Sequence, residues 1–181
     1  MRHARPASFF VGLLLIALCG CGYTTRSVVR IDEPSIYVEN FLNNIDTARE
    51  ISDARPYYAY RPAIESDITR EVINKFLLDG NYQIEGPKSA HFLLKGELVS
   101  FERQPLRYDA NDNVTEYRLS VVVNMKLHDL YEKETVWKES DFAGETTYRT
   151  SGALSKTESA AIQEAIEDLA QRIVERTVED W

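Results

Sequence analysis

The sequence predicts an α+β domain in which two helices pack on one face of a four-stranded mixed β-sheet. Two observations indicate this fold. Four segments alternate apolar and polar residues, as half-buried strands do, and two longer segments repeat apolar residues at every third or fourth position, as amphipathic helices do. The expected order is strand, helix, three strands and helix, or β-α-β-β-β-α. We therefore expect residues 35–181 to form one domain, a two-layer sandwich.

The clearest strand is residues 115–127. The odd-numbered positions from 117 onward are apolar and share one face, whereas the positions between them are mostly polar. A slip of one residue would move the whole apolar set to the solvent face, so the pattern fixes the register. Burial of these side chains is worth on the order of 10 kcal/mol, at roughly 1.5–3 kcal/mol each. The apolar set is Tyr117, Leu119, Val121, Val123, Met125 and Leu127.

The other strands are shorter or less regular. Residues 35–41 and 91–101 alternate as strands do, and residues 82–84 are extended. After a short polar turn at 131–134, residues 135–145 are expected to return as the fourth strand. Trp137 and Phe142 have opposite parity in it, which indicates either a β-bulge or a strand covered on both faces. Residues 102–114 and 144–152 are polar and are expected to be connections.

The first helix is expected to begin at Pro62, which suits the first turn because its missing N–H is no loss there. Ile64, Ile68, Val72 and Phe76 then recur at every fourth residue, and Ile73 and Leu77 widen the stripe. A glycine and an asparagine at 80–81 end the helix. Because the central strand needs an apolar cover, this stripe is expected to face the sheet.

The second helix is expected to begin at a capping box formed by Ser155 and Glu158 and to run close to Trp181. Its apolar stripe is interpreted as the other half of the cover over the sheet. The stripe consists of Ile162, Ala165, Ile166, Leu169, Ile173 and Val174.

Residues 1–20 have the pattern of a cleaved lipoprotein signal peptide. Arg2 and Arg5 form a positive start, and the apolar run that follows is too short to span a bilayer as a mature helix. The run ends in Leu-Cys-Gly-Cys at 18–21, which resembles the lipobox of bacterial lipoproteins. The resemblance implies cleavage before Cys21 and acylation of that cysteine. The alternative is an ordinary secretory cleavage that leaves Cys21 free.

Residues 21–34 are expected to form a lipidated N-terminus and a tether, which would span ~40 Å when extended. A multiply acylated cysteine holds a protein to a membrane firmly, whereas a single acyl chain anchors it only reversibly. The residue after Cys21 is Gly22. Lipoproteins kept at the inner membrane commonly carry Asp at this position, so the resemblance implies the cell outer membrane, with the domain facing the periplasm.

Composition and motifs argue against several classes of function. A net charge of −8 at pH 7 disfavours nucleic acid as a partner, because such a surface needs a basic stripe. His91 and His128 lack the spacing and cysteine partners of a zinc site. Asp109 begins a segment like a calcium loop, but Val114 replaces the glycine of the turn and Ser120 replaces the bidentate glutamate. No nucleophile elbow, phosphate loop or dinucleotide fingerprint is present. We therefore expect no metal, no cofactor and no enzymatic activity.

Several short sequences follow one another in a particular order. They are Cys-Gly-Tyr at 21–23, the helix end Leu-Asp-Gly-Asn-Tyr at 78–82, Thr-Glu-Tyr-Arg-Leu at 115–119, and Leu-His-Asp at 127–129 with Val-Trp at 136–137 after it. With the closing helix, this order resembles the LptE family of lipopolysaccharide-assembly lipoproteins, over nearly the whole chain after residue 20.

The resemblance implies a non-enzymatic outer-membrane lipoprotein that plugs and helps assemble the β-barrel LptD and assists delivery of lipopolysaccharide to the cell surface. Two alternatives remain. One is a lipoprotein subunit of another envelope assembly, such as a secretion or pilus complex. The other is an envelope hydrolase that uses an acidic pair, for example Glu97 and Glu102.

The expected strand directions bring basic side chains to one end of the sheet. If residues 91–101 run upward, the next strand runs down and the last runs up, so the connections 102–114 and 144–155 meet at the top. This end would hold Arg103, Arg107 and Lys156, with Arg55 and Arg61 as well if the first strand is parallel to the second.

The family resemblance gives these charges a role, because Arg107 and Lys156 match by position basic residues that the LptE family is thought to use in binding lipopolysaccharide. We expect Arg107, Lys156 and Arg103 to form the ligand site. The alternative is that they are solvated charges near a helix start. Tyrosines at 57, 58 and 60 likewise form either a partner contact or a cover over the core edge.

Overall fold

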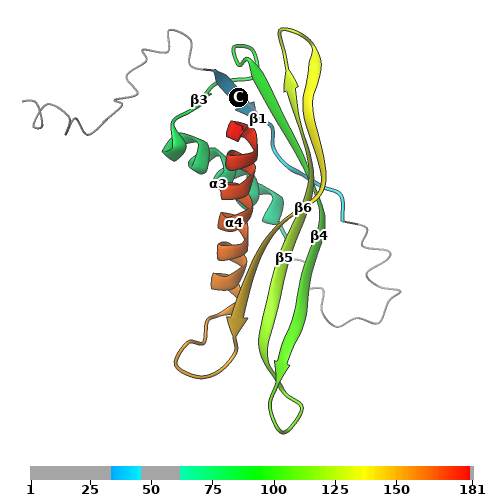
Figure 1. Ribbon diagram of the computed structural model, residues 1–181, viewed down its shortest axis with the longest axis vertical. Helices are drawn as coiled ribbons and strands as arrows, with labels where there is room; N and C mark the ends of the chain where they lie inside the picture. The colour runs from blue at the N-terminus through cyan, green and yellow to red at the C-terminus, as the bar shows by residue number, and fades with distance from the viewer. Residues whose placement is uncertain (1–33, 46–61, 180–181) are drawn as a thin grey trace, which may run out of the picture. The chain divides into compact units, whose positions relative to one another are not determined.

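The computed structural model describes residues 34–45 and 62–179, which form six strands and two helices (Figure 1). The expected signal peptide, Cys21 and most of the tether, the tyrosines at 57–60, Arg55 and Arg61 lie outside the described residues. The elements are β1 (Ser35–Val38), β2 (Leu42–Asn43), α3 (Ile64–Asp79), β3 (Gln83–Ile84), β4 (Phe92–Tyr108), β5 (Val114–Asp129), β6 (Glu134–Arg149) and α4 (Glu158–Glu179).

The sheet is mixed and open, with the strand order β3-β1-β4-β5-β6, and β2 pairs with β4 beside this path. β1 runs parallel to β3 and β4, whereas β4, β5 and β6 are antiparallel neighbours. The prediction of an α+β fold with two helices and a mixed sheet is confirmed, but the sheet has six strands rather than four. The two additional strands, β2 and β3, have two residues each. β3 lies in the segment predicted to be extended at 82–84, whereas β2 is too short for an alternating pattern to reveal.

The three antiparallel strands are longer than predicted. β4 continues to Tyr108 and β6 to Arg149, so most of the two expected connections at 102–114 and 144–152 is strand. Most residues of these extensions are exposed or half-buried, and a strand with little buried surface shows little apolar alternation. The actual turn is residues 109–113, where Asp109 Oδ1 accepts the backbone N–H groups of Asn111 (2.8 Å) and Asn113 (3.0 Å).

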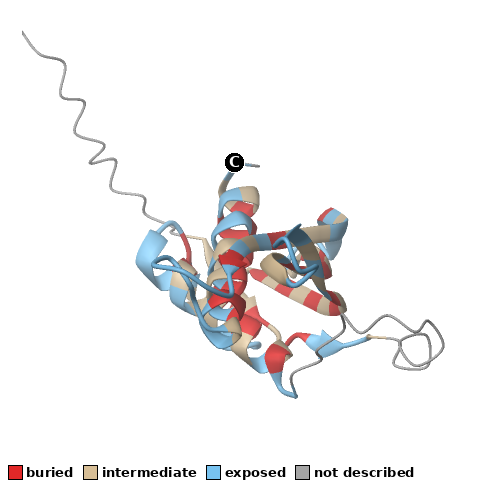
Figure 2. Ribbon diagram, turned by 90° about the horizontal axis from the view of Figure 1, so that it is seen from below, coloured by how far each residue is buried: buried red, intermediate tan, exposed pale blue. Residues whose placement is uncertain are grey.

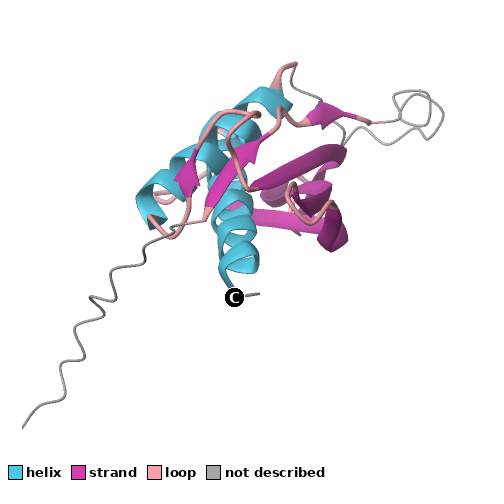
Figure 3. Ribbon diagram, turned by 90° about the horizontal axis from the view of Figure 1, so that it is seen from above, coloured by secondary structure: helices cyan, strands magenta, loops and turns pink. Residues whose placement is uncertain are grey.

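The core lies between the sheet and the two helices, which Figure 3 shows on the same side of the strands. On β5 the odd-numbered residues from Leu119 to Leu127 are at most 2% exposed, as their alternation predicts. Figure 2 shows the same alternation of buried and less buried positions along the strands. Every fourth residue of the first predicted stripe, from Ile64 to Phe76, and every residue of the second are buried, so both stripes belong to this core. The predicted widening of the first stripe is wrong at Leu77, which is 61% exposed, whereas Ile73 is partly buried.

The first helix, α3, begins at Ile64, two residues after Pro62, and ends where it was predicted to end. Gly80 follows its last turn with a φ of 75°, and the Gly80 N–H donates to the Phe76 carbonyl oxygen at 3.0 Å. Only a residue that tolerates the left-handed region can close a helix in this way, which explains the glycine.

The second helix, α4, begins without the predicted capping box. Thr157 takes that place, because its Oγ1 accepts the Ala160 N–H at 3.2 Å. Ser155 lies outside the helix and forms an isolated bridge with Arg149 of β6. Glu158 is the first residue of α4, and its side chain is engaged elsewhere, as described below.

Two glycines allow other segments to approach the sheet closely. A Cβ atom at Gly96 of β4 would overlap the ring of Phe41, which lies between β1 and β2. A Cβ atom at Gly144 of β6 would overlap the Leu169 side chain of α4 and lie 2.5 Å from the Ala165 carbonyl oxygen. The missing side chain at Gly144 therefore sets how closely α4 packs on β6.

The last strand, β6, contains a bulge. The register shifts between Phe142 and Glu139, so that two residues of β6 face Asn124 of β5. Asp141 has a φ of 54° at this point, and its N–H donates to Asn124 Oδ1 at 3.0 Å. Of the two alternatives drawn from the opposite parity of Trp137 and Phe142, the structure shows the bulge.

Side chains of α4 reach the outer edge of β6. Arg172 Nη1 donates to the Ala143 carbonyl oxygen, and Asp168 Oδ2 accepts the Glu145 N–H at 3.0 Å. The Arg172 guanidinium also lies over the Phe142 ring, 5.1 Å from its centroid. These contacts occupy backbone groups that an edge strand would otherwise offer to another chain.

Candidate functional site

The charged end of the sheet is formed where β4 ends, β5 begins, β6 ends and α4 begins. Arg107 of β4 is paired with Glu116 of β5, which is paired in turn with Arg149 of β6. The β4–β5 turn and the loop before α4 therefore lie at the same end, which is the lower end in Figure 1. This confirms the predicted strand directions. They follow from the antiparallel pairing of three consecutive strands.

Arg103 joins β4 to the first turn of α4. Its Nη1 lies 2.6 Å from Glu158 Oε2, and its guanidinium lies over the Tyr117 ring, 4.9 Å from the centroid. Burial by itself would lower the pKa of Arg103, but the Glu158 charge and a hydrogen bond with Tyr148 outweigh burial and raise it. Arg103 is therefore a fixed cation, and its Nε atom is buried with no hydrogen-bond partner among the described residues.

Tyr117 and Tyr148 lie beside Arg103, and their rings pack against each other. Their rings are stacked with centroids 5.6 Å apart and an interplanar angle of 23°. Tyr148 is 5% exposed, and Tyr117 is half-buried. Burial, followed by the nearby Glu158 charge, raises the pKa of Tyr148. The phenol hence stays neutral beside the Arg103–Glu158 pair.

Lys156 precedes α4 and binds a carboxylate on its second turn. Its Nζ lies 2.6 and 2.7 Å from the two carboxylate oxygens of Glu164, and Thr146 Oγ1 of β6 donates to the same carboxylate at 3.1 Å. The hydrogen bond from Lys156 is the main reason that the pKa of Glu164 is lowered, while burial opposes it. The Lys156 N–H also donates to the Arg149 carbonyl oxygen at 3.0 Å, which fixes the loop against β6.

Arg107 lies on the opposite face of the sheet from Arg103. Arg103 is directly opposite Leu119, which is completely buried on the helix-covered face. Arg107 is directly opposite Glu116, three residues earlier on β5 and so on the other face, and the Arg107 Nε lies 3.2 Å from Glu116 Oε2. The structure thus brings Arg103, Arg107 and Lys156 to one end but onto two faces. Each of the three is paired with a carboxylate.

The same end also carries exposed apolar side chains. Leu106 and Tyr108 of β4 are 39% and 55% exposed, and Leu154 in the loop before α4 is 71% exposed. Apolar side chains beside cations make a surface suited to a ligand with both anionic groups and hydrocarbon.

The acidic partners of these cations could not be identified from sequence. Glu158 and Glu164 lie on α4 and Glu116 lies on β5, and their pairing depends on how the helix is placed on the sheet. The only local signal was the closeness of Lys156 to Glu164 along the chain.

Among the described residues, no group of three His, Cys, Asp or Glu side chains is arranged to hold a metal ion. Neither α3 nor α4, the helices of the described part, is both long and apolar enough to cross a membrane.

The elements and their order define the class of two-layer α+β domains with an open mixed sheet. Within this class, the chain belongs to the LptE lipopolysaccharide-assembly family, whose sequence model matches residues 35–177. The match spans all the described strands and nearly all of α4. No curated protein sequence matches the chain.

Solved bacterial structures share the fold at low sequence identity. A protein of Xanthomonas campestris is 15% identical with a TM-score of 0.53, and the similarity covers 82% of this chain and 86% of that one. A minor lipoprotein of Acinetobacter baumannii is 17% identical with a TM-score of 0.53, covering 82% and 94%. A hypothetical protein of Chlamydia trachomatis is 10% identical with a TM-score of 0.51, covering 81% and 96%.

Proposed function

We propose that the chain is a lipid-anchored lipoprotein of the cell outer membrane that plugs an LptD-type β-barrel, helps that barrel assemble and assists delivery of lipopolysaccharide. The observation that carries this proposal is the LptE family match over residues 35–177. The role is structural and non-enzymatic. Residues 1–20 are the signal peptide, Cys21 carries the acyl groups, residues 21–34 are the tether, and residues 35–181 are the domain that acts in the periplasm.

The charged end of the sheet is the proposed contact for lipopolysaccharide, through Arg103, Arg107 and Lys156. Lipopolysaccharide combines phosphate groups with acyl chains, and this end combines cations with exposed Leu106 and Leu154. The carboxylates do not prevent such binding. Lys156 and Glu164 are 44% and 38% exposed, so a phosphate could exchange with Glu164 at small cost, since exposed pairs contribute about 0–1 kcal/mol. Arg107 is 69% exposed but Glu116 only 18%, so a phosphate would bind Arg107 beside Glu116 or at a higher cost.

Arg103 has a different part in this proposal. It is only 22% exposed and is held by Glu158 and by the Tyr117 ring, so it positions the start of α4. We propose that Arg103 adds positive potential to the site while Arg107 and Lys156 make the exchangeable contacts.

The first experiment tests the barrel partner. An affinity-tagged chain is extracted from outer membranes in mild detergent, and the proteins that remain bound after washing are identified by mass spectrometry. An LptD-type β-barrel in near-equal amount is the expected result. A secretion or pilus component in its place would support the alternative envelope assembly, and a chain that purifies alone would contradict the plug.

The second experiment tests the ligand site. Arg107→Asp combined with Lys156→Asp is expected to weaken lipopolysaccharide binding at least tenfold at low salt, with a smaller difference at high salt because exposed charges are screened. The matched control is Arg70→Asp with Lys88→Asp, which makes the same change of charge at two exposed sites on α3 and in the turn before β4. Barrel association should survive in both variants. Equal lipopolysaccharide affinity of the two variants would remove Arg107 and Lys156 from the site.

A further inference from the structure

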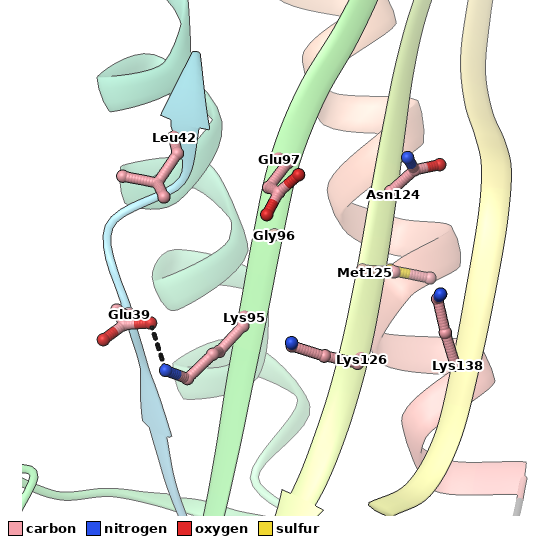
Figure 4. A pocket seen from close by; sticks show the side chains of 9 residues that line it. All are labelled: Glu39, Leu42, Lys95, Gly96, Glu97, Asn124, Met125, Lys126 and Lys138. Atoms are coloured by element: carbon pink, nitrogen blue, oxygen red, sulfur yellow. Dashed lines mark ion pairs between the residues drawn. The ribbon is translucent and has the colours of Figure 1, made fainter. Parts of the chain in front are cut away.

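Three lysines form a row across the face of the sheet that the helices do not cover. Lys95 of β4 is directly opposite Lys126 of β5, and Lys126 is directly opposite Lys138 of β6. Figure 4 shows this row from the open side, with the helices behind the strands. Directly opposed residues in an antiparallel sheet have Cβ atoms roughly 5 Å apart, so three positive charges share one short row.

This arrangement is unfavourable for the chain alone. Like charges directly opposite each other destabilise a sheet. Within the described part of the chain, Lys95 is the one lysine of the row with an acidic partner, Glu39, with Nζ and Oε2 3.1 Å apart. Lys126 and Lys138 form no ion pair with any described residue, although the chain as a whole carries a net charge of −8. Because Lys138 is exposed and Lys126 is half-buried, water screens much of this repulsion, and its cost to the fold is small. The positive charge nevertheless stands without a nearby counter-charge on β5 and β6 of the described residues.

The row borders a pocket of about 290 Å³. Its lining includes all three lysines and the side chain of Asn124. In Figure 4, Lys95 turns toward Glu39 at one side, whereas Lys126 reaches across toward β4. Glu97 also lines the pocket and accepts a hydrogen bond from Asn44 at 3.3 Å. Both carboxylates thus lie on the β1 and β4 side, and the unpaired positive charge lies on β5 and β6.

We propose that this lysine row is a binding site for a phosphate group. A phosphoryl group carries up to two negative charges and three acceptor oxygens, so it can accept from several ammonium groups at once. Lysine binds phosphate as a compact point charge, without the fixed fork that arginine uses. Lys126 and Lys138 would make the direct contacts, Lys95 would be drawn from Glu39, and Asn124 would offer an amide donor. The pocket is large enough for a headgroup but at the lower limit for a whole small molecule.

The lysine row is separate from the charged end of the sheet. Along β5, Lys126 lies ten residues from Glu116, the partner of Arg107. At about 3.3 Å per residue, the two sites are roughly 30 Å apart, several times the screening length at physiological salt. The proposal does not depend on lipopolysaccharide binding at the charged end.

The test uses the full chain with Cys21→Ala, so that no acyl chain inserts into vesicles. Inorganic phosphate is titrated at constant ionic strength, and binding is followed by the NMR signals of the lysine side chains and by the melting temperature. A second arm measures binding to phosphatidylcholine vesicles with and without phosphatidic acid. The site variant is Lys126→Met with Lys138→Met. The control is Lys75→Met with Lys88→Met, which removes the same charge from α3 and the turn before β4.

The site variant should lose at least tenfold in affinity for the phosphate probe, and the control should not. Without phosphate the site variant should melt at the same temperature or higher, because a repulsion is removed; this separates a lost site from a damaged fold. Binding of inorganic phosphate would indicate a free phosphate or phosphate ester, and binding of phosphatidic acid vesicles alone would indicate a lipid headgroup. Equal affinity of the two variants, or no binding of either probe by the parent chain, would overturn the proposal.

Discussion

Gly144 of β6 and Leu169 of α4 pack so closely that a Cβ atom at residue 144 would overlap the Leu169 side chain. The Ala165 carbonyl oxygen would be only 2.5 Å away, and a backbone atom cannot move aside as a flexible side chain can. Gly144→Ala is therefore expected to destabilise the domain by about 1–3 kcal/mol, the usual cost of overpacking. Urea denaturation of the variant and the parent chain measures this difference in the free energy of unfolding.

Gly86→Ala is the matched control for Gly144→Ala, because a Cβ atom at Gly86 would meet nothing within 4 Å. Equal denaturation midpoints for the two variants would mean that α4 is not seated on β6 as described.

The register of β5 gives a second prediction from two neighbouring residues. Val123 is fully buried, and Asn124 lies on the other face. Val123→Asp would bury a charge without a partner and should cost several kcal/mol, comparable to the whole stability of a domain of this size. Asn124→Asp keeps the oxygen that accepts the Asp141 N–H and should be tolerated. Thermal melts followed by circular dichroism compare them, and similar melting temperatures would disprove the register.

The Lys156–Glu164 pair gives a prediction about pH. The pKa of Glu164 in the folded chain is lowered from its ordinary value of 4.5, chiefly by the Lys156 hydrogen bond. Because folding lowers the pKa of Glu164, its ionised carboxylate stabilises the fold at pH values above the ordinary pKa. This stabilisation is lost as the pH falls through the pKa of Glu164 in the folded chain. Lys156→Met should therefore reduce stability near neutral pH by less than about 1 kcal/mol, because the pair is partly exposed.

The difference between Lys156→Met and the parent chain should shrink as the pH falls below about 4.5. Lys88→Met, at an exposed turn, serves as control and should give a difference that does not depend on pH in this range. Denaturation at pH 3, 4 and 6 distinguishes these outcomes. A Lys156→Met difference that is constant with pH would show that the ion pair does not perturb Glu164.

The proposed anchor is tested at Cys21. Cys21→Ala should release the protein into the soluble periplasmic fraction, because the acyl groups are what hold it to the membrane. Its melting temperature should not change if residues 21–34 are only a tether. The experiment requires cells without the barrel partner, which could retain the protein by itself. Continued membrane fractionation in such cells would refute lipidation as the anchor.

The parts of the fold that could be predicted are those in which one face is buried and the other is not. The parity of Leu119 to Leu127 and the helical stripes show this, since burial imposes the period on the sequence. The outer parts of β4 and β6 could not be predicted, because few of their side chains are buried. The bulge at Asp141 was half-predicted: the opposite parity of Trp137 and Phe142 required an irregularity but did not say which kind.

The charged sites show a different limit. The strand directions were enough to place Arg103, Arg107 and Lys156 at one end. The face that Arg107 occupies depends on a register shift between Pro105 and Arg107, near the end of β4. Pro105 is a residue typical of bulges, but its presence does not say how the register shifts. The lysine row could not be predicted for the same reason. The alternation of β5 places Lys126 on the solvent face, but its alignment with Lys95 and Lys138 depends on the register between the strands. Charge pairing between elements is thus a tertiary property.

The contacts of Asp168 and Arg172 with the edge of β6 affect how the chain can meet another β-protein. A barrel wall or a second copy cannot continue the sheet past Ala143 and Glu145, since those backbone groups are already occupied, and the kink at Asp141 interrupts the line of the strand on the other side. We expect a partner that meets this stretch of β6 to be recognised through side chains. An association of that kind leaves the hydrogen bonds of this sheet unchanged, so the fold of the chain would be the same with and without its partner.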